Sequence, residues 1–275
     1  MRNVSKTETT QHLKNLAAYG YTRVADFMGS ETLARLKLLV ERLHKETKHL
    51  PYAGRPDRDV DDKIIYNLQN KDKYFIDILA DPFIKRTLME KLNDPYYRFL
   101  PQDVPNYILS YYNARSSGRK LDLHIDTYIP FHGEWTWAMQ VAFILDDQTE
   151  ANGCTTVVPG SHLSGRYTDR DLENVVPLPS RGGDLVLWDS RLWHGTLENA
   201  AKTPRWSLIA TFTTWWVKQN MDMTRSLPNR IYRQLTEEQK ALLGFCSIPP
   251  KDETGRINTK SGYDTLLDFV EDYYK

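Results

Sequence analysis

Between about residues 104 and 217, short β-branched and aromatic runs alternate with turn residues. Asn152-Gly153, Pro159-Gly160 and Gly182-Gly183 supply turn chemistry between these runs. The runs, of which there are at least six, read NYILSYYNA, LDLHIDTYI, WTWAMQVAFIL, CTTVVPG, DLVLWDS and RWSLIATFTTWW. Short strands without intervening helices predict an antiparallel barrel or sandwich, of which the double-sheet jelly roll is one form. We therefore expect a mainly β fold.

Helical patterns flank this β-rich part. Leucines recur at helical spacing in SETLARLKLLVERLHKET, and Pro82 in KYFIDILADPFIKRTLMEKLND marks the expected start of a second helix. The stretch LPYAGRPDRDVDD is polar, carries two prolines and a glycine, and predicts a loop that could act as a lid. Near the end, TEEQKALLG predicts a helix, and the chain finishes in YDTLLDFVEDYYK. We expect a single domain, 1–275, with a mostly helical part (1–103), a jelly-roll core (104–217) and a C-terminal extension (218–275).

Composition excludes several classes of partner. The chain of 275 residues carries 36 basic and 36 acidic residues, whereas a nucleic-acid-binding protein usually shows a basic excess. No window approaches the roughly 18 apolar residues of a membrane span, and the N-terminus lacks the apolar stretch of a secretory signal. Cys154 and Cys246 show neither metal nor redox spacing and are expected to be reduced and packed. We expect a cytoplasmic protein that has no membrane span and binds no nucleic acid.

The run LDLHIDTYIPF places a histidine and an aspartate two residues apart. Side chains at i and i+2 of a strand point the same way, so His124 and Asp126 would converge on a point that could hold a proton or a metal. In a chain of this composition, the odds that at least one His-x-Asp occurs by chance are about even. The motif therefore indicates a site only together with further residues. A rival, HGE at 132–134, lies beside Pro130 and contains a glycine, which favours a loop.

His194 is the partner that the pattern favours. It ends the apolar run of DLVLWDSRLWHGTLE and precedes a glycine, and a late strand of a jelly roll can return beside an early one. Two imidazoles and one carboxylate leave about three open positions on an octahedral ion. That arrangement suits Fe(II) binding a co-substrate and dioxygen, while zinc would accept the same ligands.

An arginine follows eleven residues after His194. Strand alternation in RWSLIATF puts Arg205 and Ser207 on one face. A strand that turns an arginine into a barrel must provide an anion, because an unpaired buried charge is very costly. The planar guanidinium suits a carboxylate in that place.

The order of these motifs resembles the phytanoyl-CoA dioxygenase family of Fe(II)/2-oxoglutarate oxygenases. The resemblance rests on the His-x-Asp motif, then NGCTTVVPGSH from Asn152 to His162, then GGDLVLWDSRLWHGT and the arginine that follows. NLAAYGYTRVADFMGSETLARL is similar to the family's opening and IIYNLQNKDKYFIDILADPFI to its second segment, so most of the chain is covered. The resemblance implies a double-stranded β-helix core, that is, a cupin-like jelly roll with flanking helices.

Site residues follow from the resemblance position by position. It implies that His124, Asp126 and His194 bind Fe(II) and that Arg205 pairs with the distal carboxylate of 2-oxoglutarate. Thr196 occupies the place where a small hydroxyl residue often helps to hold that carboxylate.

Two further residues near these motifs are treated differently. Ser207, which shares the face of Arg205, is a second candidate for holding the carboxylate of the co-substrate. His162 is left outside the ligand set, because the expected task of PGSH is to shape a turn. Halogenating relatives replace the aspartate of the His-x-Asp motif by a small residue; this chain keeps Asp126, so the resemblance favours hydroxylation.

The implied reaction hydroxylates an unactivated C–H bond with dioxygen and converts 2-oxoglutarate to succinate and carbon dioxide. The family spans acyl-CoA thioesters, compatible solutes, lipopolysaccharide sugars and antibiotic precursors, so it does not choose the substrate. The expected loop NARSSGRK, 113–120, carries three basic residues that would attract an anion. Aromatic residues near the ligands would either bind a ring or fill the barrel: Tyr128, Phe131, Trp135 and Trp137.

A small polar or anionic metabolite is the expected substrate. Two other classes stay open at this point. A metal-dependent, cupin-like isomerase or hydrolase would use the same three ligands without needing Arg205. A non-catalytic jelly roll that binds a small molecule would need neither the ligands nor the arginine.

Overall fold

The computed structural model describes residues 1–50, 62–96, 103–127, 132–133, 135–168, 170, 172–248 and 252–254. Most of the expected lid loop, Tyr128, Phe131, Glu134 and the C-terminal YDTLLDFVEDYYK lie outside the described residues. Within the described part, no helix has the length and apolar character needed to cross a membrane.

Two compact units divide the chain. The first consists of Met1–Tyr66 and Tyr112–Ala210, and the second of Asn67–Tyr111 and Thr211–Lys275. All six candidate site residues belong to the first unit. The division of 1–275 into a helical part, a core and an extension within a single domain stays a prediction.

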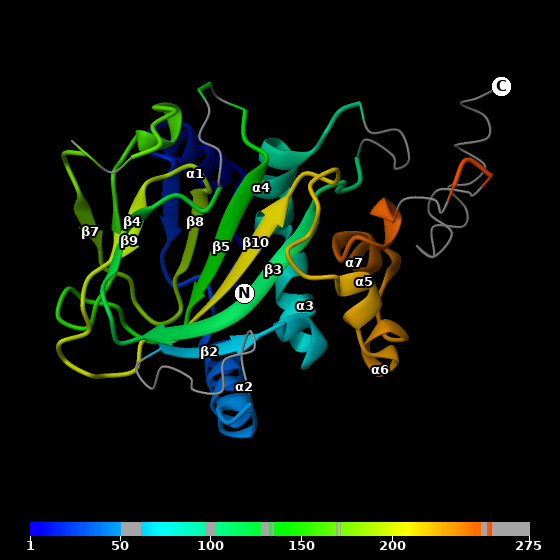
Figure 1. Ribbon diagram of the computed structural model, residues 1–275, viewed down its shortest axis with the longest axis horizontal. Coiled ribbons are helices and arrows are strands. Elements are labelled where there is room, and N and C mark those ends of the chain that lie inside the picture. The colour runs from blue at the N-terminus through cyan, green and yellow to red at the C-terminus, as the bar shows by residue number, and fades with distance from the viewer. Residues whose placement is uncertain are drawn as a thin grey trace. The chain divides into compact units, whose positions relative to one another are not determined.

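Strands in the described residues form two antiparallel sheets with open edges. The six-stranded sheet has the order β1-β8-β5-β10-β3-β2, and the four-stranded sheet has the order β4-β9-β6-β7. Figure 1 shows β5, β10 and β3 side by side in the larger sheet. The bounds are β1 Tyr21–Val24, β2 Asp62–Tyr66, β3 Ile108–Ser117, β4 Leu121–His124, β5 Ala138–Ile144, β6 Thr155–Val157, β7 Val176–Leu178, β8 Leu185–Asp189, β9 His194–Thr196 and β10 Ser207–Thr213.

The two sheets of the first unit pack face to face. One buried cluster combines Ala142 of β5 and Val186 of β8 from the larger sheet with Val157 of β6 from the smaller one. Ile209 of β10 packs against the same cluster, so the face of β10 that carries odd-numbered residues points between the sheets. The mainly β, jelly-roll prediction is confirmed, and its core lies between these sheets.

Helices of the first unit begin and end where the sequence chemistry requires. α1 (Lys6–Tyr19) starts with a capping box of Ser5 and Glu8 and ends at Gly20, whose φ of 81° is left-handed. α2 (Ser30–Thr47) matches the predicted leucine-rich helix and buries Leu36, Val40, Leu43 and Thr47.

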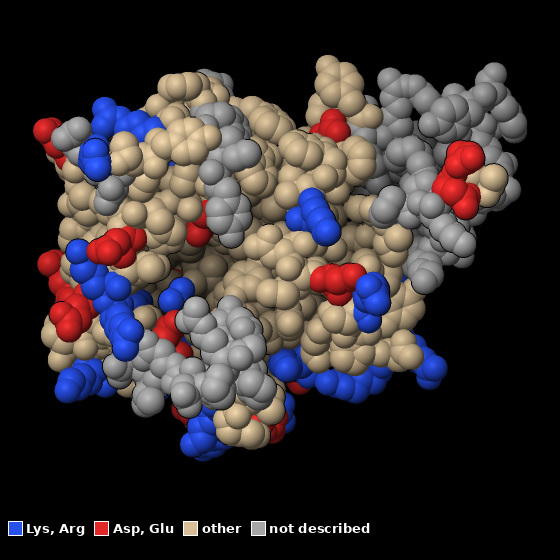
Figure 2. All heavy atoms as spheres, viewed as in Figure 1, with Lys and Arg blue, Asp and Glu red and all other residues tan. Residues whose placement is uncertain are grey.

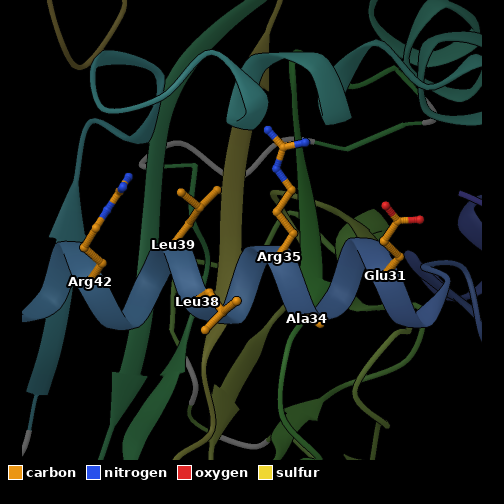
Figure 3. A pocket seen from close by; sticks show the side chains of 6 residues that line it. All are labelled: Glu31, Ala34, Arg35, Leu38, Leu39 and Arg42. Carbon is orange, nitrogen blue, oxygen red and sulfur yellow. The ribbon is translucent and has the colours of Figure 1, made fainter.

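The outward face of α2 bears charged residues and leucines. Leu38 is 67% exposed there. Figure 3 shows Arg42, Leu39, Arg35 and Glu31 projecting from one side of α2, with Leu38 and Ala34 on another side, around a shallow groove. A single carboxylate and no histidine or cysteine line this groove in the described residues, so it offers no metal-binding cluster.

The second unit is largely helical. Asp81 caps α4 (Pro82–Leu92) by accepting from the amide of Phe83, which confirms the helix start predicted at Pro82. Lys85 of α4 pairs with Glu238 at 2.9 Å, where the predicted TEEQKALLG helix forms α7 (Glu237–Leu242). The remaining short helices are η1 Leu68–Asn70, α3 Tyr74–Asp77, η2 Ile78–Ala80, α5 Met223–Ser226, α6 Asn229–Tyr232 and η4 Phe245–Ser247, with η3 Ser161–Leu163 in the first unit.

Candidate metal centre

Two histidines face each other across neighbouring strands of the smaller sheet. β4 pairs with β9 so that Leu121 lies opposite Thr196 and His124 opposite His194. Three steps along β4 therefore match two steps along β9, which defines a bulge that turns His124 onto the face of His194. The imidazole ring centroids lie 4.3 Å apart.

Strand alternation alone does not place Asp126 beside the histidines, because β4 ends at His124. The backbone amides of Asp126 and Thr127 donate to the carbonyl of Ser190, at 2.9 and 3.1 Å. Trp188 Nε1 donates to Asp126 Oδ2 at 3.1 Å. These bonds place the Asp126 carboxylate 3.7 Å from His124 Nε2 and 3.5 Å from His194 Nε2.

Backbone carbonyl groups orient both imidazoles. His124 Nδ1 lies 2.9 Å from the carbonyl oxygen of Asp122, and His194 Nδ1 lies 2.9 Å from that of Leu192. A carbonyl oxygen can only accept, so each Nδ1 carries a proton, and Nε2 is the nitrogen of each ring that faces the carboxylate. Metal-ligating histidines usually donate their other ring N–H to a carbonyl or carboxylate in this way.

The cluster fits one metal ion. One ligand atom from each of the three side chains lies within 4.8 Å of the others. Two donors that bind the same ion at about 2.0–2.2 Å lie at most about 4.4 Å apart. Asp126 Oδ1 lies 3.7 Å from His124 Nε2 and Asp126 Oδ2 lies 3.5 Å from His194 Nε2, so each imidazole meets this limit with a different oxygen of the carboxylate. Burial lowers the pKa of His124, and the adjacent His194 lowers it further, so His124 is held in the neutral form that a metal requires.

Arg205 is a buried cation in the same unit. It is 6% exposed, and its Nε donates to the carbonyl of Ser117 at 2.8 Å. Burial lowers the pKa of Arg205, with a smaller contribution from Arg115. Asp62 acts in the opposite direction, but its carboxylate is already paired with Arg115 at 3.0 Å. No described carboxylate forms an ion pair with Arg205, so the guanidinium is suited to an added anion.

Thr196 links Arg205 to the histidines. It lies two residues after His194 on the same face of β9, and Arg205 Nη2 donates to its hydroxyl oxygen at 3.5 Å. The same oxygen accepts from the amide of Leu121 at 3.1 Å, which leaves the hydroxyl proton of Thr196 to be donated elsewhere. Ser207, the other hydroxyl candidate, accepts from Gln148 Nε2 at 3.2 Å.

Two histidines that the sequence analysis kept outside the ligand set also lie outside this cluster. His162 is in η3, where its Nε2 lies 3.2 Å from the carbonyl oxygen of Ala17. His132 is exposed and forms an isolated bridge with Ser164.

Trp188 and Ser190, which hold Asp126, were missed by the sequence analysis. Alternation along DLVLWDS would place Trp188 on the face of the core, but neither hydrogen bond can be read from spacing.

The expected basic loop 113–120 is mostly strand. Asn113–Ser117 form the end of β3, so that prediction was wrong for five of its residues. Arg115 pairs with Asp62, and Lys120 pairs with Asp122 at 3.2 Å. Figure 2 shows basic and acidic side chains mixed across one face of the molecule, without a stripe of one sign.

Comparisons with known proteins agree on one family and one fold. The family described as Phytanoyl-CoA dioxygenase (PhyH) matches residues 16–207. Dioxygenase af480 of Aspergillus fumigatus is 26% identical over 190 residues, which is 67% of this chain and 59% of that protein. The match to the uncharacterized protein Rv1501 of Mycobacterium tuberculosis, 31% identical, covers 40% of this chain and 41% of that protein. The chain thus spans about half the length of the curated relatives that it matches.

Solved structures share the fold. HygX from Streptomyces hygroscopicus, with nickel and 2-oxoglutarate bound, aligns with a TM-score of 0.61 at 14% identity, over 79% of this chain and 90% of that one. The epimerase SnoN, in complex with Fe3+, alpha ketoglutarate and nogalamycin RO, aligns with a TM-score of 0.61 at 18% identity, over 82% of this chain and 92% of that one.

Proposed function

The chain belongs to the phytanoyl-CoA dioxygenase family, and we propose that it is an Fe(II)- and 2-oxoglutarate-dependent dioxygenase that hydroxylates a small polar or anionic metabolite. His124, Asp126 and His194 hold the iron through two Nε2 atoms and a carboxylate oxygen. When bound, Fe(II) with 2-oxoglutarate and dioxygen supplies the oxidising power for attack on a C–H bond, with release of succinate and carbon dioxide.

One observation carries the proposal: a three-ligand cluster lies in the same unit as a buried arginine that no described carboxylate pairs with. Three protein ligands leave positions for a chelating co-substrate, and Arg205 supplies the charge for its distal carboxylate. An isomerase or hydrolase that used the same ligands would have no use for this cation. The nickel and 2-oxoglutarate bound to HygX, and the Fe3+ and alpha ketoglutarate in complex with SnoN, support the same choice of cofactors.

Each residue has a defined task in this reaction. Arg205, fixed by Ser117, anchors the distal carboxylate, and the hydroxyl of Thr196 donates to it. The indole N–H of Trp188 fixes which oxygen of Asp126 faces His194. Trp188 belongs to the apolar cluster between the sheets and packs against His194, which shields that ligand from water.

Charge near the cluster supports the substrate class. Burial is the main cause of the lowered pKa of His124 and of Arg205, and Arg115 adds a smaller lowering to each, so its positive field reaches the site. Asp62 and Asp122 offset Arg115 and Lys120, which suits a small metabolite with one negative or polar group better than a highly charged one. Dioxygen and 2-oxoglutarate are the other partners. The buried thiols of Cys154 and Cys246 support a reducing, cytoplasmic location.

The test compares two aspartates of the same segment. Asp126→Ala should lose tight binding of a divalent metal and all succinate formation from 2-oxoglutarate. Asp122→Ala is the matched control, because the side chain of Asp122 is 86% exposed and only its backbone carbonyl contacts His124. Succinate formation that survives in Asp126→Ala would refute the ligand assignment. A wild type that binds metal but neither binds nor consumes 2-oxoglutarate would favour the isomerase or hydrolase class.

A further inference from the structure

A buried ion pair lies in the turn that precedes His194. Arg191 is the bulkiest fully buried side chain of the described residues. Its Nε donates to Asp189 Oδ1 at 3.0 Å and its Nη2 to Asp189 Oδ2 at 2.8 Å, so the pair is bidentate. None of the tasks assigned above uses either residue.

The pair fixes the conformation of a single turn. Asp189 ends β8, and only Ser190 separates it from Arg191. The Asp189 carboxylate accepts from the backbone amide of Arg191 at 2.9 Å, and its backbone carbonyl accepts from the amide of Leu192 at 2.8 Å. The side chains and the backbone therefore close the same loop of chain from Asp189 to Leu192.

This turn presents the two carbonyl groups that orient metal ligands. The carbonyl of Ser190 accepts from the amides of Asp126 and Thr127, and that of Leu192 accepts from His194 Nδ1. Asp126 and His194 come from different parts of the chain. Both are hydrogen-bonded to this turn, and the ion pair sets its geometry.

The same pair also binds the chain that leaves Asp126. Arg191 Nη1 donates to the carbonyl of Gly133 at 2.8 Å, and the hydroxyl of Thr136 donates to Asp189 Oδ1 at 3.2 Å. Gly133 and Thr136 lie between the aspartate ligand and β5. The pair therefore contacts both the segment after the second ligand and the segment before the third.

Stability alone is a poor reason to keep such a pair, because replacing a buried ion pair by apolar residues is often neutral or stabilising. We propose that Asp189 and Arg191 are positioning residues, whose bidentate pair sets the separation of Asp126 and His194 and thereby the affinity of the metal centre. This inference rests on the proposed function, in which these ligands hold Fe(II).

The test is a metal titration of the full chain. Arg191→Lys keeps the charge but loses the bidentate pair with Asp189 and the bond to the carbonyl of Gly133. It should therefore weaken Ni(II) or Co(II) binding by about 10–100-fold, which is the usual effect of losing a residue that orients a metal ligand. Thr136→Val removes the hydroxyl that contacts Asp189 Oδ1 at 3.2 Å and the carbonyl oxygen of Ala138 at 3.0 Å, and should weaken binding by a smaller factor. It keeps the test decisive if Arg191→Lys does not fold.

Matched controls separate positioning from general destabilisation. Leu36→Ala, in the fully buried face of α2, lowers the melting temperature without touching the turn. At equal loss of melting temperature, metal affinity should fall in the Arg191 and Thr136 variants but stay at the wild-type value in Leu36→Ala. The absorption spectrum of bound Co(II) should also change in the Arg191 variant, because the ligand geometry changes.

The outcomes distinguish failure of this inference from failure of the proposed function. Wild-type affinity and an unchanged Co(II) spectrum in folded Arg191→Lys and Thr136→Val, together with lost binding in His194→Ala, would overturn the positioning role alone. Metal binding that His194→Ala leaves intact would overturn the metal centre itself.

Discussion

Replacement of Trp188 by Phe removes one hydrogen bond at the metal centre. The indole N–H donates to Asp126 Oδ2 at 3.1 Å, the ring lies 5.4 Å from the ring of His194 between centroids, and the residue is 9% exposed. Phe keeps an aromatic ring in the core but has no donor. We expect Trp188→Phe to bind a divalent metal more weakly, with folding largely retained.

The magnitude follows from the charge on the acceptor. A hydrogen bond to a charged group contributes about 1.5–3 kcal/mol, and 1.4 kcal/mol corresponds to a factor of about 10 in affinity. Residues that hydrogen-bond to a metal ligand orient it, and their loss typically lowers metal affinity by about 10–100-fold. We therefore predict a 10-fold to 100-fold increase in the dissociation constant.

The assay is isothermal titration of the metal-free protein with Ni(II), well below the melting temperature. Trp206→Phe is the matched control, because its ring, also 9% exposed, packs against His44 instead of a ligand. The control should keep wild-type affinity. Equal or tighter metal binding by folded Trp188→Phe would show that the indole does not hold Asp126 in its ligating orientation.

Three further changes test separate parts of the site and the fold. Gly195→Ala places a Cβ 2.5 Å from the carbonyl oxygen of Leu121, so β4 must shift and Ni(II) affinity should fall by at least 10-fold in the same titration. Thr196→Val should weaken 2-oxoglutarate binding to the metal-loaded protein by about 5–10-fold, the equivalent of a hydrogen bond of about 1 kcal/mol. Calorimetry should show a smaller effect for Ser207→Ala, because the described contacts join Arg205 to the hydroxyl of Thr196, whereas Ser207 bonds to Gln148. Burial lowers the pKa of His12 below its ordinary 6.5, so the unfolded chain binds the proton first and the metal-free protein should lose stability as pH falls below about 6.5. His12→Asn should reduce that slope in urea unfolding; an unchanged slope would contradict the assignment.

The sequence predicted the architecture because its signals are local. Alternation and turn residues marked the runs that became β3, β5, β8 and β10, and leucine spacing marked α2. β1 and β2 were not predicted, because four or five residues without turn signals carry little information, and pairing with β8 and β3 stabilises them.

The residues of the candidate site could be predicted from the sequence for a different reason. The ligands were proposed from their residue types and from a family resemblance, but the geometry that brings them together is not local. The bulge between Leu121 and His124 changes the register by one residue, and Asp126 is placed by Ser190, 64 positions later. Pairing registers and bonds over such separations depend on the folded core, and spacing along a single chain does not encode them.

In the proposed function, a metal at the His124, Asp126 and His194 cluster and the cation of Arg205 bind one 2-oxoglutarate together. Anaerobic calorimetric titration of 2-oxoglutarate into the protein, with and without Fe(II), tests this joint binding. We expect stoichiometric binding that requires the metal and is lost in folded, metal-loaded Arg205→Ala. Binding that is indifferent to Fe(II), or that survives in Arg205→Ala, would contradict it.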